Sequence, residues 1–348
     1  MIYFDAAAAA PPDPAVLDFQ REAALRCYAN QEAAHAFARS LRREMEEAAQ
    51  KLAHLLADES YHVLWAASGT DLFQAFATLP EFRGRPCLCD LVHPALASAL
   101  GSAMRPLPAP DPADPPRLLA ASHIESETGR RLDFETFRAA APGVPVLADT
   151  IQSAGKEPLP RADFLTLSGH KLGAPAAALL YRDPEGRRGE WFRDLRHRDY
   201  RFGRPDPAAV LTLVFAVKRA CARMEENRRR VESINHTLRE ALPAIPLRGG
   251  QHPVPTLPPE AASPYILHFL LPGMQGAVAA RMLSEMDIFA ASGSACQAET
   301  DRPSPALLAL GYSRAEAYSG LRLSFSPANT LAEAAAFIDA FRRLARDY

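Results

Sequence analysis

The sequence lacks the features that mark secreted, membrane-spanning and nucleic-acid-binding proteins. Its formal net charge is only −2 over 348 residues, so no broad basic surface points to nucleic acid. Apolar runs stay below the roughly 18 residues that a membrane-spanning helix needs. The start MIYFDAAAAAPPDP has no basic segment followed by a long apolar one, unlike a signal peptide. We therefore expect a cytoplasmic protein with neither a nucleic-acid nor a membrane partner.

Cysteine is scarce and irregularly spaced. The five cysteines are Cys27, Cys87, Cys89, Cys221 and Cys296, and this odd, uneven set argues against a disulfide framework and for a reducing compartment. Cys87 and Cys89 form a C-x-C pair, but no second Cys/His pair lies near it in the sequence. Alternating positions on a strand explain this pair better than zinc does, so we predict no metal site.

Glycine is also infrequent, with 18 residues against 31 prolines. The segment RPLPAPDPADPPR (105–117) is so rich in proline that it can hold neither a helix nor a central strand. We predict a surface loop there. Apolar periodicity runs along most of the remaining chain, which favours a folded protein with a proline-studded surface over a disordered one.

Residues 61–181 alternate between short apolar runs and helical patterns. Apolar runs without polar alternation are typical of strands that are buried on both faces. These runs are YHVLWA (61–66), PCLCDL (86–91), RLLAAS (117–122), VPVLAD (144–149), DFLTLS (163–168) and AAALLY (176–181). Helical patterns near 71–79, 94–103 and 133–141 lie between some of them, and this rhythm predicts a mainly parallel α/β sheet.

Further helices and strands are predicted before residue 61 and after residue 181. Helical spacing covers 14–57, with a break near Asn30, and 206–242, as one long helix or a pair. Further on we expect strands at 264–271, 287–291 and 320–326 and helices at 274–286, 303–310 and 331–346. The chain length suits two domains. We predict a large α/β domain over 13–235 and a smaller α+β domain from 1–12 and 236–348.

A lysine follows one of the buried strands in the motif SGHKLGAP (168–175). Lys171 at the end of such a strand is poorly placed for solvent, and loss of water lowers the pKa of an amine and favours Schiff-base chemistry. Ser168 and His170 beside it can bind a phosphate oxygen. Taken alone, the motif also fits an ordinary loop that begins after a strand.

An aspartate ends the strand VPVLAD, 22 residues before Lys171. A pyridoxal-phosphate (PLP) enzyme needs a buried carboxylate at the ring nitrogen, and the carboxyl end of a sheet strand provides such a position. Asp149 has that position. Gln152 lies three residues further on and can bind the phenolic oxygen of the ring. The ordinary alternative for Asp149 is a helix N-cap.

Two more motifs follow strands in the same way. In ASGTDLF (67–73), the glycine turn before a helix offers free N–H groups, with the Ser68 and Thr70 hydroxyls around Gly69, for a phosphate. His93 in LVHPAL can stack on a planar ring, although a histidine there is more often a helix cap or part of a core. Each motif is weak on its own.

Together these motifs stand in the order found in cysteine desulfurases of the NifS/IscS type, in the class V aminotransferase group, and the sequence resembles that family over nearly its whole length. MIYFDAAAAAPPDP resembles the opening Y-L-D-N-A-A-T-T-P, and ANQEAAH (29–35) resembles N-P-S-S-x-H. ASGSACQAE (291–299) resembles the active-cysteine segment S-S-G-S-A-C. GLRLSFSPANT (320–330) resembles the segment with the arginine that binds the substrate carboxylate.

The resemblance implies a fold-type I PLP-dependent transferase, whose large domain has a mainly parallel seven-stranded sheet flanked by helices. It implies that L-cysteine is converted to L-alanine, with a persulfide on Cys296 that passes to an acceptor protein, and that the chain forms a homodimer. Lys171, Cys296 and His93 are the implied catalytic residues. The implied cofactor-binding residues are Lys171, Asp149, Gln152, His93, Ser68, Gly69, Thr70, Ser168, His170 and Arg204. Those implied for the substrate are Arg322, Asn30 and His35.

The sequence departs from the family pattern at several polar positions. Ala6 stands where the family has asparagine, and Ser126 stands where an asparagine contacts the ring's phenolic oxygen. Arg204, in RFGR (201–204), stands where a threonine of the partner subunit binds the phosphate, and arginine can still bind phosphate. One lost neutral hydrogen bond costs roughly 0.5–1.5 kcal/mol, so we expect PLP to bind still.

Two other classes of function remain open. One is a different PLP reaction on the same fold, such as a C–S lyase, a selenocysteine lyase or an amino-acid epimerase. The other is a non-catalytic subunit that serves as a scaffold or regulator, which the alanine-rich opening motif favours. The small, polar surroundings of Cys296 predict a mobile exposed loop and favour sulfur transfer.

Overall fold

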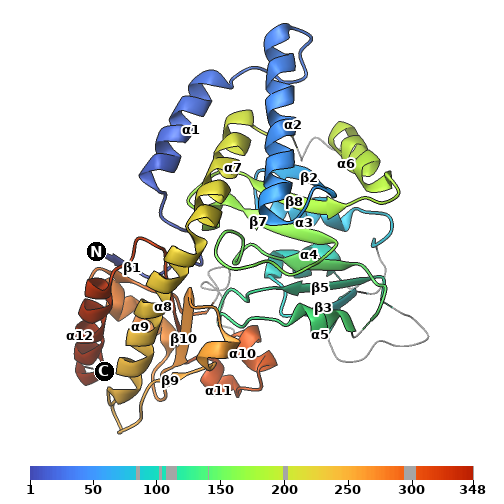
Figure 1. Cartoon of the computed structure of the whole chain (residues 1–348). Coiled ribbons are helices and arrows are strands. Elements are labelled where there is room, and N and C mark those ends of the chain that lie inside the picture. The colour runs from blue at the N-terminus through green and yellow to red at the C-terminus, as the bar shows by residue number, and fades with distance from the viewer. Residues whose placement is uncertain are drawn as a thin grey trace. The chain divides into compact units, whose positions relative to one another are not determined.

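The computed structural model describes residues 1–83, 87–101, 104–106, 116–139, 141–198, 203–293 and 303–347 (Figure 1). The chain divides into two compact units. The large unit comprises Pro11–His123 and Leu132–Arg223, and the small unit comprises Met1–Ala10, Ile124–Arg131 and Met224–Tyr348. In the part of the chain that the structure describes, no helix is long and apolar enough to cross a membrane.

The large unit is built on a seven-stranded sheet. Its strands are β2 (Tyr61–Ala66), β3 (Cys87–Asp90), β4 (Met104–Pro106), β5 (Leu118–Ser122), β6 (Val146–Asp149), β7 (Phe164–Ser168) and β8 (Ala177–Arg182). They lie in the order β2-β8-β7-β6-β5-β3-β4. Strand β8 is antiparallel to both of its neighbours, whereas the pairs from β7 to β4 are parallel. The predicted mainly parallel α/β sheet is thus confirmed, and each of the six apolar runs contains a strand.

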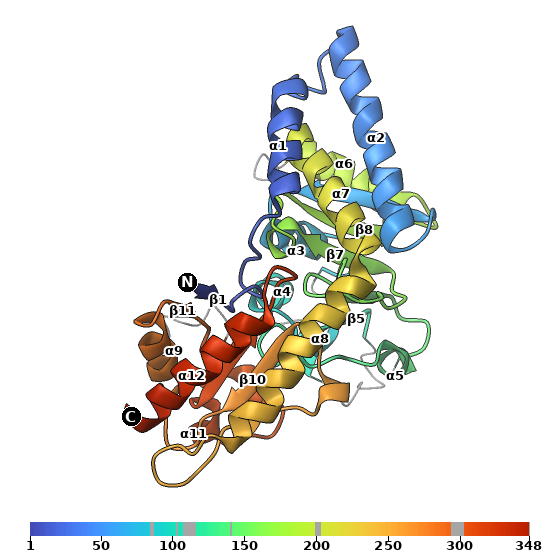
Figure 2. The ribbon, with the colours of Figure 1, turned by 60° about the vertical axis from the view of Figure 1, so that its left-hand side comes forward.

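Continuous apolar runs form these strands because both faces of the sheet are buried. In β5, Leu119 and Ala121 enter one core while Leu118 and Ala120 enter the other, as the period of two residues requires. The first core also takes side chains from the helices α1 (Pro14–Arg26), α2 (Ala36–Leu56), α5 (Phe134–Ala139) and α7 (Pro207–Ala222). The second takes them from α3 (Gly69–Ala77), α4 (Pro94–Leu100) and α6 (Arg187–Arg198). Helices α1 and α2 both pack against α7 (Figure 2).

The structure differs from the predicted elements in a few places. Arg105 and Pro106, predicted as the start of a loop, lie in β4. This strand is at the edge of the sheet, where a proline without an N–H donor is tolerated. Helix α6 was not predicted because its sequence, RRGEWFRDLRHR, has few apolar residues to mark a buried face. The region 206–242 forms a pair of helices, since α8 begins at Met224.

The small unit contains a three-stranded antiparallel sheet in the order β12-β10-β9. Its strands are β9 (Val254–Pro255), β10 (Ile266–Leu270) and β12 (Gly320–Ser324), while β1 (Ile2–Tyr3) pairs with β11 (Ile288–Phe289). Helices α8 (Met224–Ala241), α9 (Gly276–Ser284) and α12 (Leu331–Asp347) share a core with one face of this sheet. Two shorter helices, α10 (Pro305–Ala309) and α11 (Arg314–Ala317), precede β12.

The two faces of the small sheet differ in chemistry. Leu267 and Leu323 belong to the core that the three helices share. The alternate positions place His268 and Arg322 on the other face, directly opposite each other across the β10–β12 pair. The segment Ile124–Arg131 packs here, because Ile124 contacts Ile266. Polar side chains are therefore buried under this segment.

Candidate active site

Three of the predicted motifs meet at one edge of the large sheet. Because β2, β6 and β7 run in the same direction, their carboxyl ends lie at the same edge. Gly69 shows how closely the motifs approach, since a Cβ added there would lie 2.9 Å from Ile151 Cδ1 and 3.8 Å from Ser168 Cβ. The glycine of ASGTDLF therefore packs closely against the segment that follows Asp149.

Asp149 is buried at the end of β6, and its carboxylate is held from one side. Oδ1 accepts a hydrogen bond from Thr166 Oγ1 at 2.8 Å and another from the Ile151 N–H at 3.1 Å. Both bonds go to the same oxygen, which leaves Oδ2 for another donor. Gln152 is also buried. Thr166, on the neighbouring strand β7, was not predicted as a site residue.

Lys171 follows β7 in a short 3-10 turn, Gly169–Lys171. The turn is tight, because a Cβ on Gly169 would lie 2.4 Å from the carbonyl oxygens of both Ala174 and Pro175. The side chain of Lys171 is half-buried, so it retains some contact with solvent. Ser168 is buried with its Oγ 3.5 Å from His170 Nδ1, whereas His170 itself is exposed.

A second lysine, Lys156, lies in the same unit and was not predicted. Burial, and secondly the positive charge of Lys171, lower the pKa of Lys156 to about 8, while Glu157 acts in the opposite direction. The two amines therefore repel each other electrostatically. The sequence signal was the lysine that ends ADTIQSAGK, which had no assigned role.

The first turn of α3 is less open to phosphate than the motif suggested. Ser68 caps the helix, since its Oγ accepts a hydrogen bond from the Asp71 N–H at 3.2 Å. The same hydroxyl donates to the Asp71 carboxylate at 2.8 Å. Gly69 and Thr70 begin the helix, where the first backbone N–H groups have no acceptor within the helix itself. The negative charge of Asp71 opposes a phosphate at this place.

His93 caps α4 through Nδ1, which accepts a hydrogen bond from the Ala95 N–H at 3.1 Å. Its ring is nearly parallel to that of Phe73, with 6.4 Å between the ring centroids. His93 therefore has the helix-capping role that was the ordinary alternative to stacking on a planar ring. Because Nδ1 is an acceptor here, the proton of the neutral imidazole lies on Nε2.

Asn30, His35 and Arg204 lie near one another on the surface of the large unit. Asn30 Oδ1 accepts a hydrogen bond from the Glu32 N–H, and His35 caps α2 through the Ala38 N–H. Arg204 forms an ion pair with Glu32 at 3.5 Å. All three predicted residues are exposed. The structure thus brings together residues that the sequence places far apart.

Arg322 lies on the buried face of the small sheet and is 1% exposed. Its Nη2 donates to Asp5 Oδ1 at 2.5 Å, and its Nη1 donates to the Ser126 carbonyl oxygen at 2.9 Å. The backbone of Ser126, not its side chain, therefore contacts the arginine. Glu127 and His268 are buried beside Arg322, and neither was predicted as a site residue.

Cys296 lies outside the described residues. Gly293 is the last described residue before it, and a Cβ added to Gly293 would lie 3.5 Å from Glu127 Oε1. Cys27 and Cys221 are free thiols. Among the residues that the structure describes, no three His, Cys, Asp or Glu side chains are grouped as metal ligands.

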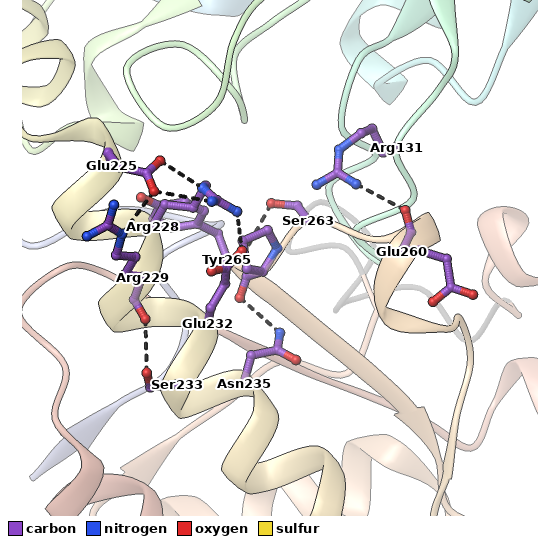
Figure 3. A network of polar contacts seen from close by, with 11 residues as sticks. Arg131, Glu225, Arg228, Arg229, Glu232, Ser233, Asn235, Glu260, Ser263 and Tyr265 are labelled. Carbon is purple, nitrogen blue, oxygen red and sulfur yellow. Dashed lines mark hydrogen bonds and ion pairs between the residues drawn. The ribbon is translucent and has the colours of Figure 1, made fainter.

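A polar cavity of about 420 Å³ lies in the small unit, between α8 and the residues around Pro259–Pro264. A network of polar contacts lies around it (Figure 3). Arg228 forms ion pairs with Glu225 and Glu232, and Arg131 donates to the Glu260 carbonyl oxygen. None of these residues belongs to the predicted site. The side chain of Asn235 ties α8 to the loop beside it, because it donates to the Pro264 carbonyl oxygen.

The family model, the sequence relatives and the solved structures that resemble this chain agree with one another. Residues 2–81 match the family model of the class-V aminotransferases. The chain is 28% identical to the IscS-like cysteine desulfurase of Mycobacterium tuberculosis, covering 97% of this chain and 95% of that protein. It is 25% identical to the cysteine desulfurase NifS of Azotobacter vinelandii, covering 86% and 81%. A solved structure of a NifS-like protein covers both chains completely, with a TM-score of 0.82 at 18% identity.

The resemblance to NifS/IscS-type cysteine desulfurases is therefore confirmed. The fold of the NifS-like structure extends over the whole chain, which confirms the predicted fold-type I architecture. The family model covers only the first part of the sequence, so the later motifs depend on the full-length relatives.

Proposed function

We propose that this chain, as a relative of the NifS/IscS-type proteins, is a PLP-dependent cysteine desulfurase. It converts L-cysteine to L-alanine and retains the sulfur atom as a persulfide on Cys296 for transfer to an acceptor protein. The observation that supports this most is the buried Asp149 carboxylate, fixed through Oδ1 by Thr166 and located 22 residues before Lys171. The relatives that span nearly the whole chain are named for the same activity.

The residues of the large unit fit PLP. Lys171 would bond to it covalently, Asp149 Oδ2 would pair with the ring nitrogen, and Gln152 would meet the phenolic oxygen. The turn at the start of α3 and Ser168, which lies close to Gly69, would bind the phosphate. When bound, PLP withdraws electrons from the substrate Cα.

Asp149 and Lys171 serve the chemistry in different ways. Asp149 would pair with the ring nitrogen, because the Thr166 hydroxyl and the Ile151 N–H bond to Oδ1 and fix the position of its carboxylate. Lys171 gives and takes the protons that the substrate exchanges, which suits an amine that is half-buried and repelled by the charge of Lys156.

The sulfur transfer itself is carried by Cys296. Its thiolate attacks the sulfur of L-cysteine, an S–S bond forms, and the C–S bond of the substrate breaks. The released carbon keeps the electron pair and gains a proton, which yields L-alanine. The protein is left with one additional sulfur atom.

Arg322 binds the substrate carboxylate in this proposal. Asp5 already pairs with its Nη2, so a second carboxylate has to share the guanidinium or displace Asp5. Sharing is possible because arginine has five N–H donors and Nε has no hydrogen-bond partner among the described residues.

The exposed group of Asn30, His35 and Arg204 supports a role toward a second subunit. A cofactor or substrate residue that serves its own chain is expected to be buried, whereas these three are exposed and held only by local contacts and Glu32. We therefore include a homodimer, with these residues facing the partner, in the proposal. The sulfur acceptor is a separate protein.

A non-catalytic subunit is the second candidate, and one observation favours it. The Asp71 carboxylate binds the Ser68 hydroxyl in the turn where a phosphate would lie. A protein without PLP would remain colourless when PLP is added during purification.

The direct test is to incubate the PLP-loaded protein with L-cysteine and to measure L-alanine, with and without a thiol reductant. A desulfurase forms alanine in both, and the reductant increases the number of turnovers because it removes the persulfide. No alanine in either condition would contradict the proposal.

A further inference from the structure

A group of ionisable side chains is buried on the face of the small sheet that carries Arg322. His268 lies directly opposite Arg322 in the β10–β12 pair, and Glu127 covers them from the segment Ile124–Arg131. The three residues are 1%, 1% and 2% exposed, in that order. Burial of such groups is costly unless each has a partner, so the group requires an explanation.

Several polar atoms of this group have no hydrogen bond. Within the described residues, Glu127 Oε1, His268 Nδ1, His268 Nε2 and Arg322 Nε are all buried and lack a partner. Glu127 Oε1 and His268 Nε2 are 3.9 Å apart, which is too far for a hydrogen bond. The hydrogen bonding of this buried group is therefore incomplete.

One glycine makes room for His268. A Cβ on Gly320 would lie 2.7 Å from His268 Nε2 and 2.8 Å from its Cε1, so the imidazole and a side chain at position 320 could not both keep their places. The Glu127 carboxyl lies close to Gly293, where a Cβ would be at the ordinary contact distance of 3.5 Å from Oε1. The His268 side chain therefore occupies space that the backbone of Gly320 leaves for it.

Charges face this group from every side. Arg322 and its counter-ion Asp5 lie on one side, and Tyr3 is affected by both. The Glu125 carboxylate accepts hydrogen bonds from the Glu127 and Thr128 N–H groups at 2.7 and 2.6 Å. These bonds fix Glu125 as a negative neighbour of Glu127.

The two titratable side chains of the group respond differently to this environment. Burial, and secondly the charge of Glu125, raise the pKa of Glu127 to about 7, although Ser304 and Arg322 act in the opposite direction. Burial, and secondly Arg322, lower the pKa of His268 to about 3. The imidazole therefore stays neutral near pH 7, while the glutamate changes its charge there.

We propose that Glu127 is a positioning residue that controls substrate affinity through Arg322, because its ionised carboxylate competes with the substrate carboxylate for the guanidinium charge. The neutral His268 imidazole lies 3.9 Å from Glu127 Oε1 and opposite Arg322 in the strand pair. Binding of an amino-acid carboxylate at Arg322 is then coupled to uptake of one proton by Glu127. The inference rests on the proposed role of Arg322 in substrate binding.

The coupling has a defined sign. When the pH rises through the titration of Glu127, a second negative charge appears beside Arg322, and the affinity for the substrate carboxylate falls. By reciprocity, a bound carboxylate makes Glu127 harder to ionise by the same factor. Glu127→Gln keeps the size of the side chain and removes the titration, so the variant should keep its affinity at high pH.

The test uses L-alanine as the probe, because it carries the amino-acid carboxylate but no sulfur. Its dissociation constant is measured from the cofactor absorbance of the PLP-loaded wild type and of Glu127→Gln between about pH 6 and about pH 8.5. The ratio of wild type to variant cancels the titration of the ligand amine and of the cofactor. We expect a ratio of about 1 at the lower pH and roughly five to ten at the higher pH.

The matched control is Glu240→Gln, which removes one exposed carboxylate of α8 without a contact to Arg322. Its ratio to the wild type should stay near 1 at every pH. A ratio that is also flat for Glu127→Gln would overturn the inference. If the wild type shows no response to L-alanine or L-cysteine at all, the proposed function fails instead.

A second measurement uses only the wild-type protein, so it tests the coupling between L-alanine binding and Glu127 protonation even if Glu127→Gln does not fold. Infrared difference spectra of the full wild-type chain follow the C=O band of protonated carboxyl groups as the pH changes. We expect one such band to titrate near pH 7, and saturating L-alanine to move its midpoint up by about one pH unit. A midpoint that L-alanine leaves unchanged contradicts the coupling.

Discussion

Arg322 donates a hydrogen bond from Nη2 to Asp5 Oδ1 at 2.5 Å, although the two residues are 317 positions apart in the sequence. The arginine that is proposed to bind the substrate thus already has a counter-ion. Its other contact, to the Ser126 carbonyl oxygen, fixes the guanidinium plane. Two distant segments of the chain, around Asp5 and Ser126, therefore fix the position of the Arg322 side chain on β12.

The first prediction concerns Arg322→Lys. Lysine keeps the positive charge but loses the planar set of donors that can hold Asp5, Ser126 and a substrate carboxylate together. The KM for L-cysteine should rise at least about tenfold. The dissociation constant of PLP should stay within about twofold, and absorbance titration measures it. Equal losses in KM and in PLP affinity would point to a structural ion pair with Asp5.

Lys171→Ala tests the covalent attachment of the cofactor. The variant should be colourless after dialysis, because it lacks the amine that bonds to PLP. Lys51→Ala, which removes an exposed lysine of α2, should remain yellow. Borohydride treatment followed by mass spectrometry gives the answer, since only an attached cofactor is fixed to the protein. A cofactor fixed to the Lys171→Ala chain would refute the assignment.

Thr166→Val removes the hydroxyl that holds Asp149 and changes the volume little. Loss of a hydrogen bond to a charged group costs about 1.5–3 kcal/mol, so the affinity for PLP should fall about tenfold or more. Thr212→Val is the matched control, because this buried threonine of α7 donates to the Ala208 carbonyl oxygen instead. Both variants should lose some stability, but unchanged PLP affinity in Thr166→Val would show that Asp149 needs no support from it.

Lys156 predicts a dependence of stability on pH. Its pKa is lowered to about 8 in the folded protein from 10.5 in the unfolded chain, so folding disfavours the charged amine. The penalty is absent above the unfolded pKa, grows as the pH falls from there to about 8, and is complete below that. Relative to wild type, Lys156→Met should therefore gain about 2–3 kcal/mol of unfolding free energy between pH 10 and pH 7.

Denaturant unfolding at both pH values measures this difference, and Lys51→Met provides the control for removal of an exposed lysine. A gain that is equal at both pH values would mean that folding does not lower the pKa of Lys156, so that the amine stays charged in the folded protein.

Much of the fold could be predicted from the sequence because the strands of the large sheet are buried on both faces. A run such as AAALLY has no polar residue to place on a solvent face, so its six residues could only form an interior element. Helix α6 and strand β4 were missed for the opposite reason. A helix with little apolar surface and a strand that contains Pro106 do not show the patterns on which such predictions depend.

The candidate site was predictable where its residues follow strands in sequence, as Asp149 and Lys171 do. The partners of the site residues were not, since Thr166 reaches Asp149 across a strand pair and Asp5 reaches Arg322 from the other end of the chain. The place of His268 depends on the absence of a Cβ at Gly320, which only the three-dimensional structure reveals.

The central claim is that sulfur passes from L-cysteine to Cys296. The most direct measurement is mass spectrometry of the PLP-loaded protein after brief exposure to L-cysteine without reductant. The account predicts one additional sulfur atom on the peptide that contains Cys296, together with L-alanine. Cys296→Ser should stay yellow but show neither. If the serine variant forms alanine and sulfide at the wild-type rate, the protein is a different lyase and the account is wrong.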